Sequence, residues 1–247
     1  MRKGIAALCI FLMAAAASHS QWNARDRLDP REQAEQLSSW QQLDSGEAQQ
    51  SSVPLAKLVY VGIDKSRWRY FEDTQHKWNW CWSACIQMVL NYSGVRISQE
   101  EIVARVKGFD ASGPVNEGGA WCEMTGALNN WMIDSLGRSH TIQTSVFEGV
   151  PNAKVLVEEL RNNRPVVVSH QEKETRHAVV VTGVAYVQDP LQPIVRFLEV
   201  YDPWPAEVRT GNDAWPTAGV SEPVGRRVHD IGWAGEIRHY WFVRVSN

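Results

Sequence analysis

The stretch Gln75–Gly94, QHKWNWCWSACIQMVLNYSG, decides how the rest of the chain is interpreted. It begins with polar residues, places Cys81 between two tryptophans and then runs almost wholly apolar to a glycine. The apolar residues recur at the spacing of a helix face, and Gly94 stands where a helix C-cap would fall. The pattern therefore predicts a buried helix with Cys81 in its first turn. The positive end of a helix dipole favours the thiolate, which is the nucleophilic form of cysteine.

Gln75 lies six residues before Cys81, and its side-chain amide can donate two hydrogen bonds. With Trp82, Ser83 and Ala84, this arrangement resembles the papain-like cysteine peptidases. In that family the glutamine side chain and the backbone N–H of the cysteine form an oxyanion hole. The resemblance implies that Cys81 is the nucleophile and that Gln75 stabilises the oxyanion. The alternative is a cysteine that is simply packed between tryptophans in the core.

A nucleophilic thiol needs a base, and the chain has seven histidines. His177 opens the run HAVVVTG, which resembles the H-A-V-x-x-x-G strand of the same family. There the histidine starts a strand and faces the cysteine, so the resemblance implies that His177 is the general base and acid. His170, at the end of the preceding valine run, is the competing candidate. We expect structural or surface roles for the histidines without a distinctive sequence frame, His140, His229 and His239.

The third catalytic group is expected at Asp202, in the sequence Tyr201-Asp202-Pro203-Trp204. The papain-like enzymes use an asparagine that is followed two residues later by a tryptophan. The resemblance implies that Asp202 orients the His177 ring and that Trp204 shields the pair from water. Two features depart from the family pattern: aspartate replaces asparagine, and a longer hairpin lies around Asp189. Asp-Pro is also an ordinary turn signal, so a purely structural role for Asp202 stays open.

The segment NEGGAW, residues 116–121, carries paired glycines at Gly118 and Gly119. It resembles the glycine segment that pairs with the substrate backbone in papain-like enzymes, and paired glycines let another main chain approach closely. Trp82 and Trp204 complete the implied substrate-binding residues. A plain surface loop is the alternative for the glycines.

Composition limits the remaining possibilities. The 247 residues include 25 basic and 28 acidic side chains, for a net charge of −3, which does not favour nucleic acid as a partner. The sequence shows no zinc-ligand spacing, phosphate-binding glycine loop or dinucleotide motif, so no metal or cofactor is expected. A peptide or protein is the expected substrate, and a monomer is favoured.

The N-terminus has the pattern of a signal peptide, predicted at residues 1–20. Arg2 and Lys3 precede an apolar run over residues 5–17 that is too short to span a bilayer. The mature protein is therefore expected to be exported, to a periplasm or beyond. Residues 21–57 are polar and are interpreted as a linker or tail, or as a vestigial pro-segment.

Removing the signal peptide leaves Cys81, Cys85 and Cys122. An odd number in an oxidising compartment leaves one thiol free. A Cys85–Cys122 disulfide would leave Cys81 free to react, and two buried free thiols are the alternative.

The predicted fold class is α+β, with one peptidase domain over residues 58–247. A strand at 58–61 precedes helices at 81–93, 98–108 and 123–136, the second with a capping box at Ser98–Glu101. A strand at 142–147 and a helix from Asn152 to Asn162 lead into strands at 166–168, 178–187, 194–201 and 236–245. The resemblance implies a two-lobed papain-like architecture, with the nucleophile helix against an antiparallel sheet.

The predicted function is an exported cysteine peptidase that forms a thioester on Cys81. An amidase, a deamidase or a transglutaminase-like toxin could use the same thioester, and an inactive binding module of the same fold is a further alternative. A thiol–disulfide oxidoreductase is less favoured, because Cys81 and Cys85 are separated by one residue more than in its usual motif.

Overall fold

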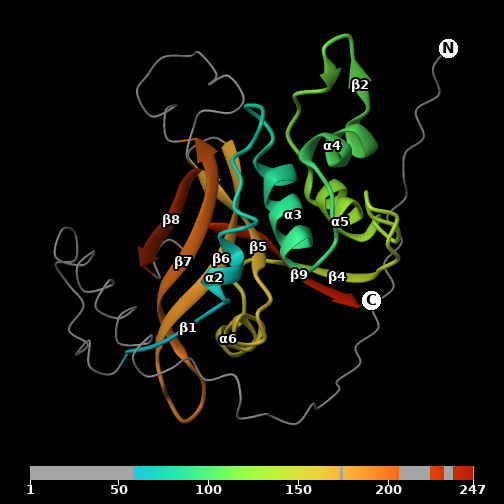
Figure 1. The fold of residues 1–247 in the computed structure, drawn as a ribbon. Coiled ribbons are helices and arrows are strands. Elements are labelled where there is room, and N and C mark those ends of the chain that lie inside the picture. The colour runs from blue at the N-terminus through green and yellow to red at the C-terminus, as the bar shows by residue number, and fades with distance from the viewer. Residues whose placement is uncertain (1–57, 173–174, 206–222, 231–235, 247) are drawn as a thin grey trace.

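A computed structural model describes residues 58–172, 175–205, 223–230 and 236–246. A seven-stranded sheet forms the centre of this part, in the order β4-β9-β5-β6-β7-β8, with β1 pairing to β6 (Figure 1). Every pair in it is antiparallel. The predicted signal peptide and polar linker lie outside the described residues.

The strands of the sheet are β1 (Leu58–Gly62), β4 (Thr141–Glu148), β5 (Val166–Glu172), β6 (Thr175–Val187), β7 (Ile194–Pro205), β8 (Pro223–Asp230) and β9 (Ile237–Ser246). Strand β6 lies between β5 and β7, and residues 178–186 are all buried. Its run of valines explains this position, because a strand covered on both faces is continuously apolar. A separate two-stranded hairpin joins β2 (Phe109–Asp110) to β3 (Gly113–Pro114).

Strand β8 has no counterpart in the sequence prediction. Its sequence contains a proline, a glycine and two arginines, and it pairs with β7 at the end of the sheet order. Proline and charged residues are typical of edge strands, and they remove the apolar alternation by which a strand is recognised. Sequence periodicity therefore misses this element for a physical reason.

The helices are α2 (Lys65–Trp68), α3 (Cys81–Tyr92), α4 (Gln99–Lys107), α5 (Trp121–Asn129) and α6 (Ala153–Arg161). Helix α3 packs on β5, β6 and β7, and α4 and α5 lie beside it (Figure 1). Helix α6 packs against β1, β5 and β6. A helical layer on an antiparallel sheet confirms the predicted α+β class.

Helix α3 ends as the sequence predicts. Gly94 adopts a φ of 97°, which glycine tolerates best. Its N–H donates to Asn91, and the N–H of Val95 donates to Leu90, which together form a Schellman cap. The predicted capping box of α4 is also present, since Ser98 and Glu101 each accept from the other's backbone N–H.

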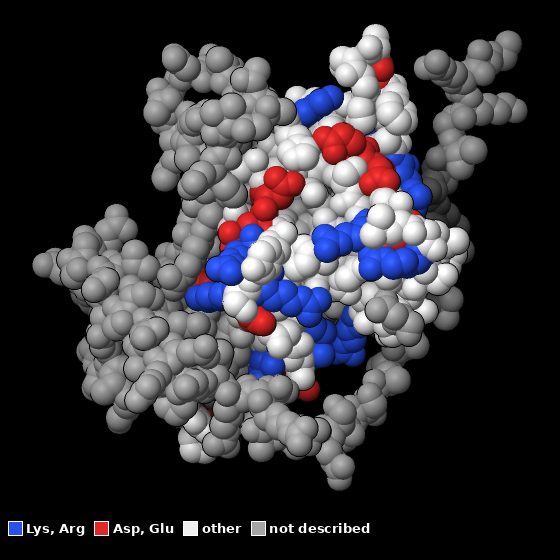
Figure 2. All heavy atoms as spheres, viewed as in Figure 1, with Lys and Arg blue, Asp and Glu red and all other residues white. Residues whose placement is uncertain are grey.

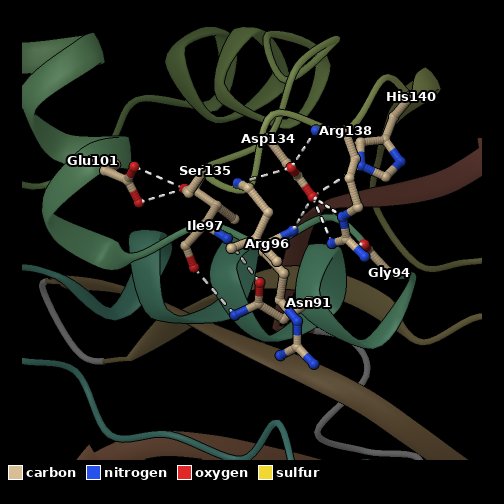
Figure 3. A network of polar contacts seen from close by, with 10 residues as sticks. Asn91, Gly94, Arg96, Ile97, Glu101, Asp134, Ser135, Arg138 and His140 are labelled. Atoms are coloured by element: carbon tan, nitrogen blue, oxygen red, sulfur yellow. Dashed lines mark hydrogen bonds and ion pairs between the residues drawn. The ribbon is translucent and has the colours of Figure 1, made fainter.

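The sequence predicted a helix over residues 123–136, and this prediction is wrong at its end, because α5 (Trp121–Asn129) stops at Asn129. The following loop folds around Asp134, whose carboxylate accepts from the backbone N–H groups of Arg96 and Arg138 and from the Arg138 guanidinium (Figure 3). His140 lies 3.0 Å from the same carboxylate. These hydrogen bonds to Asp134 stabilise the loop in place of a longer helix. The apolar pattern of the sequence does not reveal them.

Candidate active site

The thiol of Cys81 is placed at the start of α3. Cys81 is the first helical residue and is half-buried, whereas its neighbours Trp80 and Trp82 are almost completely buried. The first N–H groups of a helix have no acceptor within the helix, so they point a partial positive charge at whatever lies before them. The two indoles are packed into the core on either side of Cys81, which itself stays partly exposed.

His177 lies near the start of β6, as predicted, and is buried. Its Nε2 lies 2.8 Å from Asp202 Oδ1. Burial alone would lower the pKa of the His177 ring, but hydrogen bonds to Asp202 and to Cys81 outweigh it and raise the pKa to about 10. The ring is thus an imidazolium at neutral pH, held between the thiol and the carboxylate.

Asp202 lies on β7, the strand that pairs with β6, and is also buried. Its Oδ1 accepts a hydrogen bond from the backbone N–H of Trp204 at 2.9 Å. The Trp204 ring meets the His177 ring edge-on, with centroids 5.7 Å apart. The structure therefore brings Cys81, His177 and Asp202 together, with Trp204 against the imidazole.

Gln75 is almost completely buried, and its backbone N–H donates to the carbonyl of Pro203 at 2.9 Å. This bond places Gln75 beside the segment that carries Asp202. Its Nε2 donates to the backbone carbonyls of Trp78 at 2.6 Å and Lys77 at 3.2 Å. Both amide hydrogens thus point to the loop that precedes α3, so the oxyanion role of Gln75 remains a prediction.

Gly118 and Gly119 lie alongside the start of α3. The indole of Trp82 donates to the Glu117 carbonyl at 3.0 Å. Asn79 donates its backbone N–H to Asn116 Oδ1 and its side-chain amide to the Asn116 carbonyl, at 3.0 and 3.1 Å. A Cβ on Gly119 would lie 2.6 Å from Trp82 Cδ2, whereas a Cβ on Gly118 would meet nothing within 4 Å. The glycine pair thus lies next to Trp82, the residue after Cys81, with open space above Gly118.

Cys81, Cys85 and Cys122 are all free thiols in the structure, so the Cys85–Cys122 disulfide considered from the sequence is not formed. Cys85 packs inside the core on α3, whereas Cys122 is half-buried in the first turn of α5. Burial raises the pKa of the Cys85 thiol well above its usual range, and the nearby charges of Cys81 and Asp202 add to this. Cys85 is accordingly a protonated core residue.

His170, the competing candidate for the base, lies beside His177 in the sheet. The two residues are cross-strand partners, and their rings are 5.6 Å apart and nearly perpendicular. The contact to Asp202 belongs to His177. Of the other described histidines, His140 contacts Asp134, and His239 stacks on Trp121.

Trp78 is a candidate site residue that sequence reasoning did not identify. The residue is 44% exposed, and its ring meets the Trp204 ring edge-on with centroids 4.8 Å apart, so it extends the aromatic wall that begins at His177. The only signal in the sequence was its place between Gln75 and Cys81, which by itself does not distinguish a wall residue from a core residue.

Within the described part of the chain, no three histidine, cysteine or acidic side chains gather as a metal site would require. None of the described helices has the length and apolar character to cross a bilayer. Basic and acidic side chains both occur on the face shown in Figure 2.

No curated protein matches the chain by sequence. The solved structures that are similar to it include a double glycine motif protease from an AMS/PCAT transporter in complex with the leader peptide, and SERA5E from Plasmodium falciparum. The first has 12% identity and a TM-score of 0.40, over 70% of this chain and 89% of the other. The second has 12% identity and a TM-score of 0.43, over 74% of this chain and 93% of the other.

The model of the Peptidase_C39 like family matches residues 69–221, which is more than half of the chain and includes Gln75, Cys81, His177 and Asp202. The chain therefore belongs to the Peptidase_C39 like family.

Proposed function

We propose that this protein is a cysteine peptidase that hydrolyses peptide bonds through a thioester on Cys81. The observation that carries the proposal is the contact chain from a thiol at a helix start, through the buried His177 ring, to the buried carboxylate of Asp202. Cysteine nucleophiles are activated in this way, by a base that a third group orients. Membership of a peptidase-like family supports the same conclusion.

In the proposed reaction the Cys81 thiolate attacks the carbonyl carbon of the substrate. A C–S bond forms, and the electron pair of the carbonyl π bond moves onto its oxygen. The imidazolium of His177 then transfers its proton to the leaving nitrogen, the C–N bond breaks and a thioester remains. Water next gives a proton to His177 and attacks the thioester. Breaking the C–S bond releases the acid and restores the thiolate.

Asp202 keeps His177 in the required orientation, since its carboxylate occupies Nε2 and leaves the other ring nitrogen for sulfur and substrate. We assign the oxyanion to the Cys81 N–H and to one amide hydrogen of Gln75, released from the longer bond to Lys77. Removing one such donor typically costs about 2.7–4 kcal/mol. Gly118 and Gly119 would pair with the substrate backbone, and Trp82 and Trp204 would line the cleft.

We further propose that the protein is exported, with residues 1–20 removed as a signal peptide. The support is the sequence pattern of the N-terminus. N-terminal sequencing of the protein recovered from outside the cytoplasm should find a start close to residue 21. A start at Met1 would contradict export by this signal.

The test of the reaction is mass spectrometry of peptides incubated with wild type, Cys81→Ala and Cys122→Ala. We expect new peptide termini with wild type and with Cys122→Ala, which removes a half-buried free thiol on α5 instead of the one at the start of α3. Cys81→Ala should give no product. Crosslinked peptides would instead indicate a transglutaminase-like enzyme, and a mass shift of a single side chain would indicate an amidase or deamidase. Cleavage by Cys81→Ala would exclude the mechanism.

A further inference from the structure

Gln99 is a fully buried polar residue outside the group of residues assigned so far. It is the first residue of α4, and its exposed fraction is 0%. Burying an amide without hydrogen bonds costs free energy, so the partners of Gln99 indicate why it is there. In the described part of the chain, its side-chain hydrogen bonds all go to one short segment, residues 73–76.

The amide of Gln99 binds the main chain on both sides of Gln75. Its Oε1 accepts from the backbone N–H of His76 at 3.0 Å, and its Nε2 donates to the carbonyl of Thr74 at 2.7 Å. Nε2 also lies 3.4 Å from Asp73 Oδ2. One rigid amide plane therefore fixes both peptide groups that flank Gln75.

A third bond fixes Gln75 from the opposite direction. Its own N–H donates to the carbonyl of Pro203, next to Asp202 on β7. The backbone around Gln75 is thus hydrogen-bonded to α4 on one side and to β7, the strand that carries Asp202, on the other. A change at Gln99 removes the bonds on the α4 side and leaves the bond to Pro203.

The surface partners of this segment are less well protected from solvent than Gln99. His76 lies 3.3 Å from Asp73 and 2.7 Å from Glu100, and hydrogen bonds to both raise its pKa to about 10. All three side chains are about one-third exposed or more, and exposed ion pairs hold geometry weakly. The buried amide of Gln99 is therefore the stronger anchor.

We propose that Gln99 is a positioning residue that holds Gln75 at the place from which its amide can reach the oxyanion. This inference rests on the proposed peptidase function. It predicts a loss in the step that develops oxyanion charge, without a loss in the reactivity of the Cys81–His177 pair. A misplacement of about 1 Å in such a group can cost about 100-fold in rate.

The experiment compares two reactions of Cys81 in wild type and in Gln99→Met, which has nearly the same shape but no amide. Peptide hydrolysis needs the oxyanion hole, whereas alkylation by iodoacetamide needs only the thiolate. We expect kcat to fall about 10- to 100-fold, with alkylation within about twofold of wild type. Gln99→Glu is measured in parallel, because it keeps the acceptor for His76 and loses the donor to Thr74 with little change in size; it should also lower kcat.

Asn91→Leu is the matched control. The amide of Asn91, on α3, likewise makes one donor and one acceptor bond to the backbone, both to Ile97 in the connection between α3 and α4, at 3.1 and 3.0 Å (Figure 3). Its loss should lower the Tm as Gln99→Met does and should leave kcat within about twofold of wild type. A wild-type kcat in a folded Gln99 variant, or a parallel fall of kcat and alkylation, would overturn the inference. A wild type that is alkylated at Cys81 but hydrolyses no peptide would overturn the proposed function itself, and the inference with it.

Discussion

The negative charge of Asp202 should raise the pKa of the His177 ring and so extend the pH range in which the ring is protonated. Asp202→Asn is a sharp perturbation, because the asparagine oxygen can still accept from the Trp204 N–H and the side-chain volume is nearly unchanged. What is lost is the negative charge 2.8 Å from His177 Nε2, between two side chains that are 9% and 5% exposed. Solvent screening at such burial is small, so the effect should be large.

The magnitude follows from that one contact. A hydrogen bond to a charged group is worth about 1.5–3 kcal/mol, and one pH unit of titration corresponds to about 1.36 kcal/mol. The substitution should therefore lower the pKa of the His177 ring by about 1–2 units. In wild type the pKa is raised to about 10, so the imidazolium persists through neutral pH and is lost as the pH rises through that value. In Asp202→Asn the loss should occur at lower pH.

The assay is the titration of ¹⁵N-labelled histidine rings by NMR, with His177→Gln to assign the signal. It needs no substrate and is independent of the proposed reaction. Identical midpoints in wild type and Asp202→Asn would refute the role of the carboxylate. A wild-type midpoint near 6.5, the value of an unperturbed histidine, would refute the ion pair as well.

Three further substitutions or measurements test neighbouring features. Gly183→Ala should lower the free energy of unfolding by about 1–3 kcal/mol, because the new Cβ would overlap the Tyr60 hydroxyl and lie 2.8 Å from its Cζ; urea denaturation measures this, and an unchanged midpoint would contradict it. Gly118→Ala should leave stability within about 0.5 kcal/mol, since its Cβ meets nothing, yet raise KM if the substrate backbone packs there; an unchanged KM argues against that role. Iodoacetamide at neutral pH should label Cys81 and spare Cys85 in the folded protein, because burial keeps the Cys85 thiol protonated; peptide mapping that finds Cys85 labelled first would contradict the site.

The parts of the fold that were predictable are those whose signals are local. The apolar spacing from Cys81 to Gly94 and the capping box of Ser98 and Glu101 involve neighbours within one or two helical turns, and the structure has both. The valine run after His177 predicted a buried strand because burial on both faces requires a continuous apolar sequence.

The features that were missed depend on distant partners. The helix expected to continue to residue 136 ends early because Asp134 collects donors from Arg96, 38 positions away, as well as from its own loop. Strand β8 is formed by pairing to β7 rather than by its own sequence pattern.

The site likewise has residues that a sequence motif predicts and contacts that it does not. Motif resemblance placed Cys81, His177 and Asp202, which the structure brings into contact. It could not show that the Gln75 amide donates to Lys77 and Trp78, or that Gln99 accepts from His76, 23 positions away, since no local pattern encodes such a bond.

The central claim is that the Cys81 thiol is paired with the His177 ring, and the rate of Cys81 alkylation by iodoacetamide at pH 6.5 tests it most directly. A thiol of ordinary acidity is about 1% ionised at that pH, so an unpaired cysteine reacts slowly. The pairing predicts rapid labelling of Cys81 in wild type and labelling at least about tenfold slower in His177→Ala. Equal and slow rates in the two proteins would contradict it.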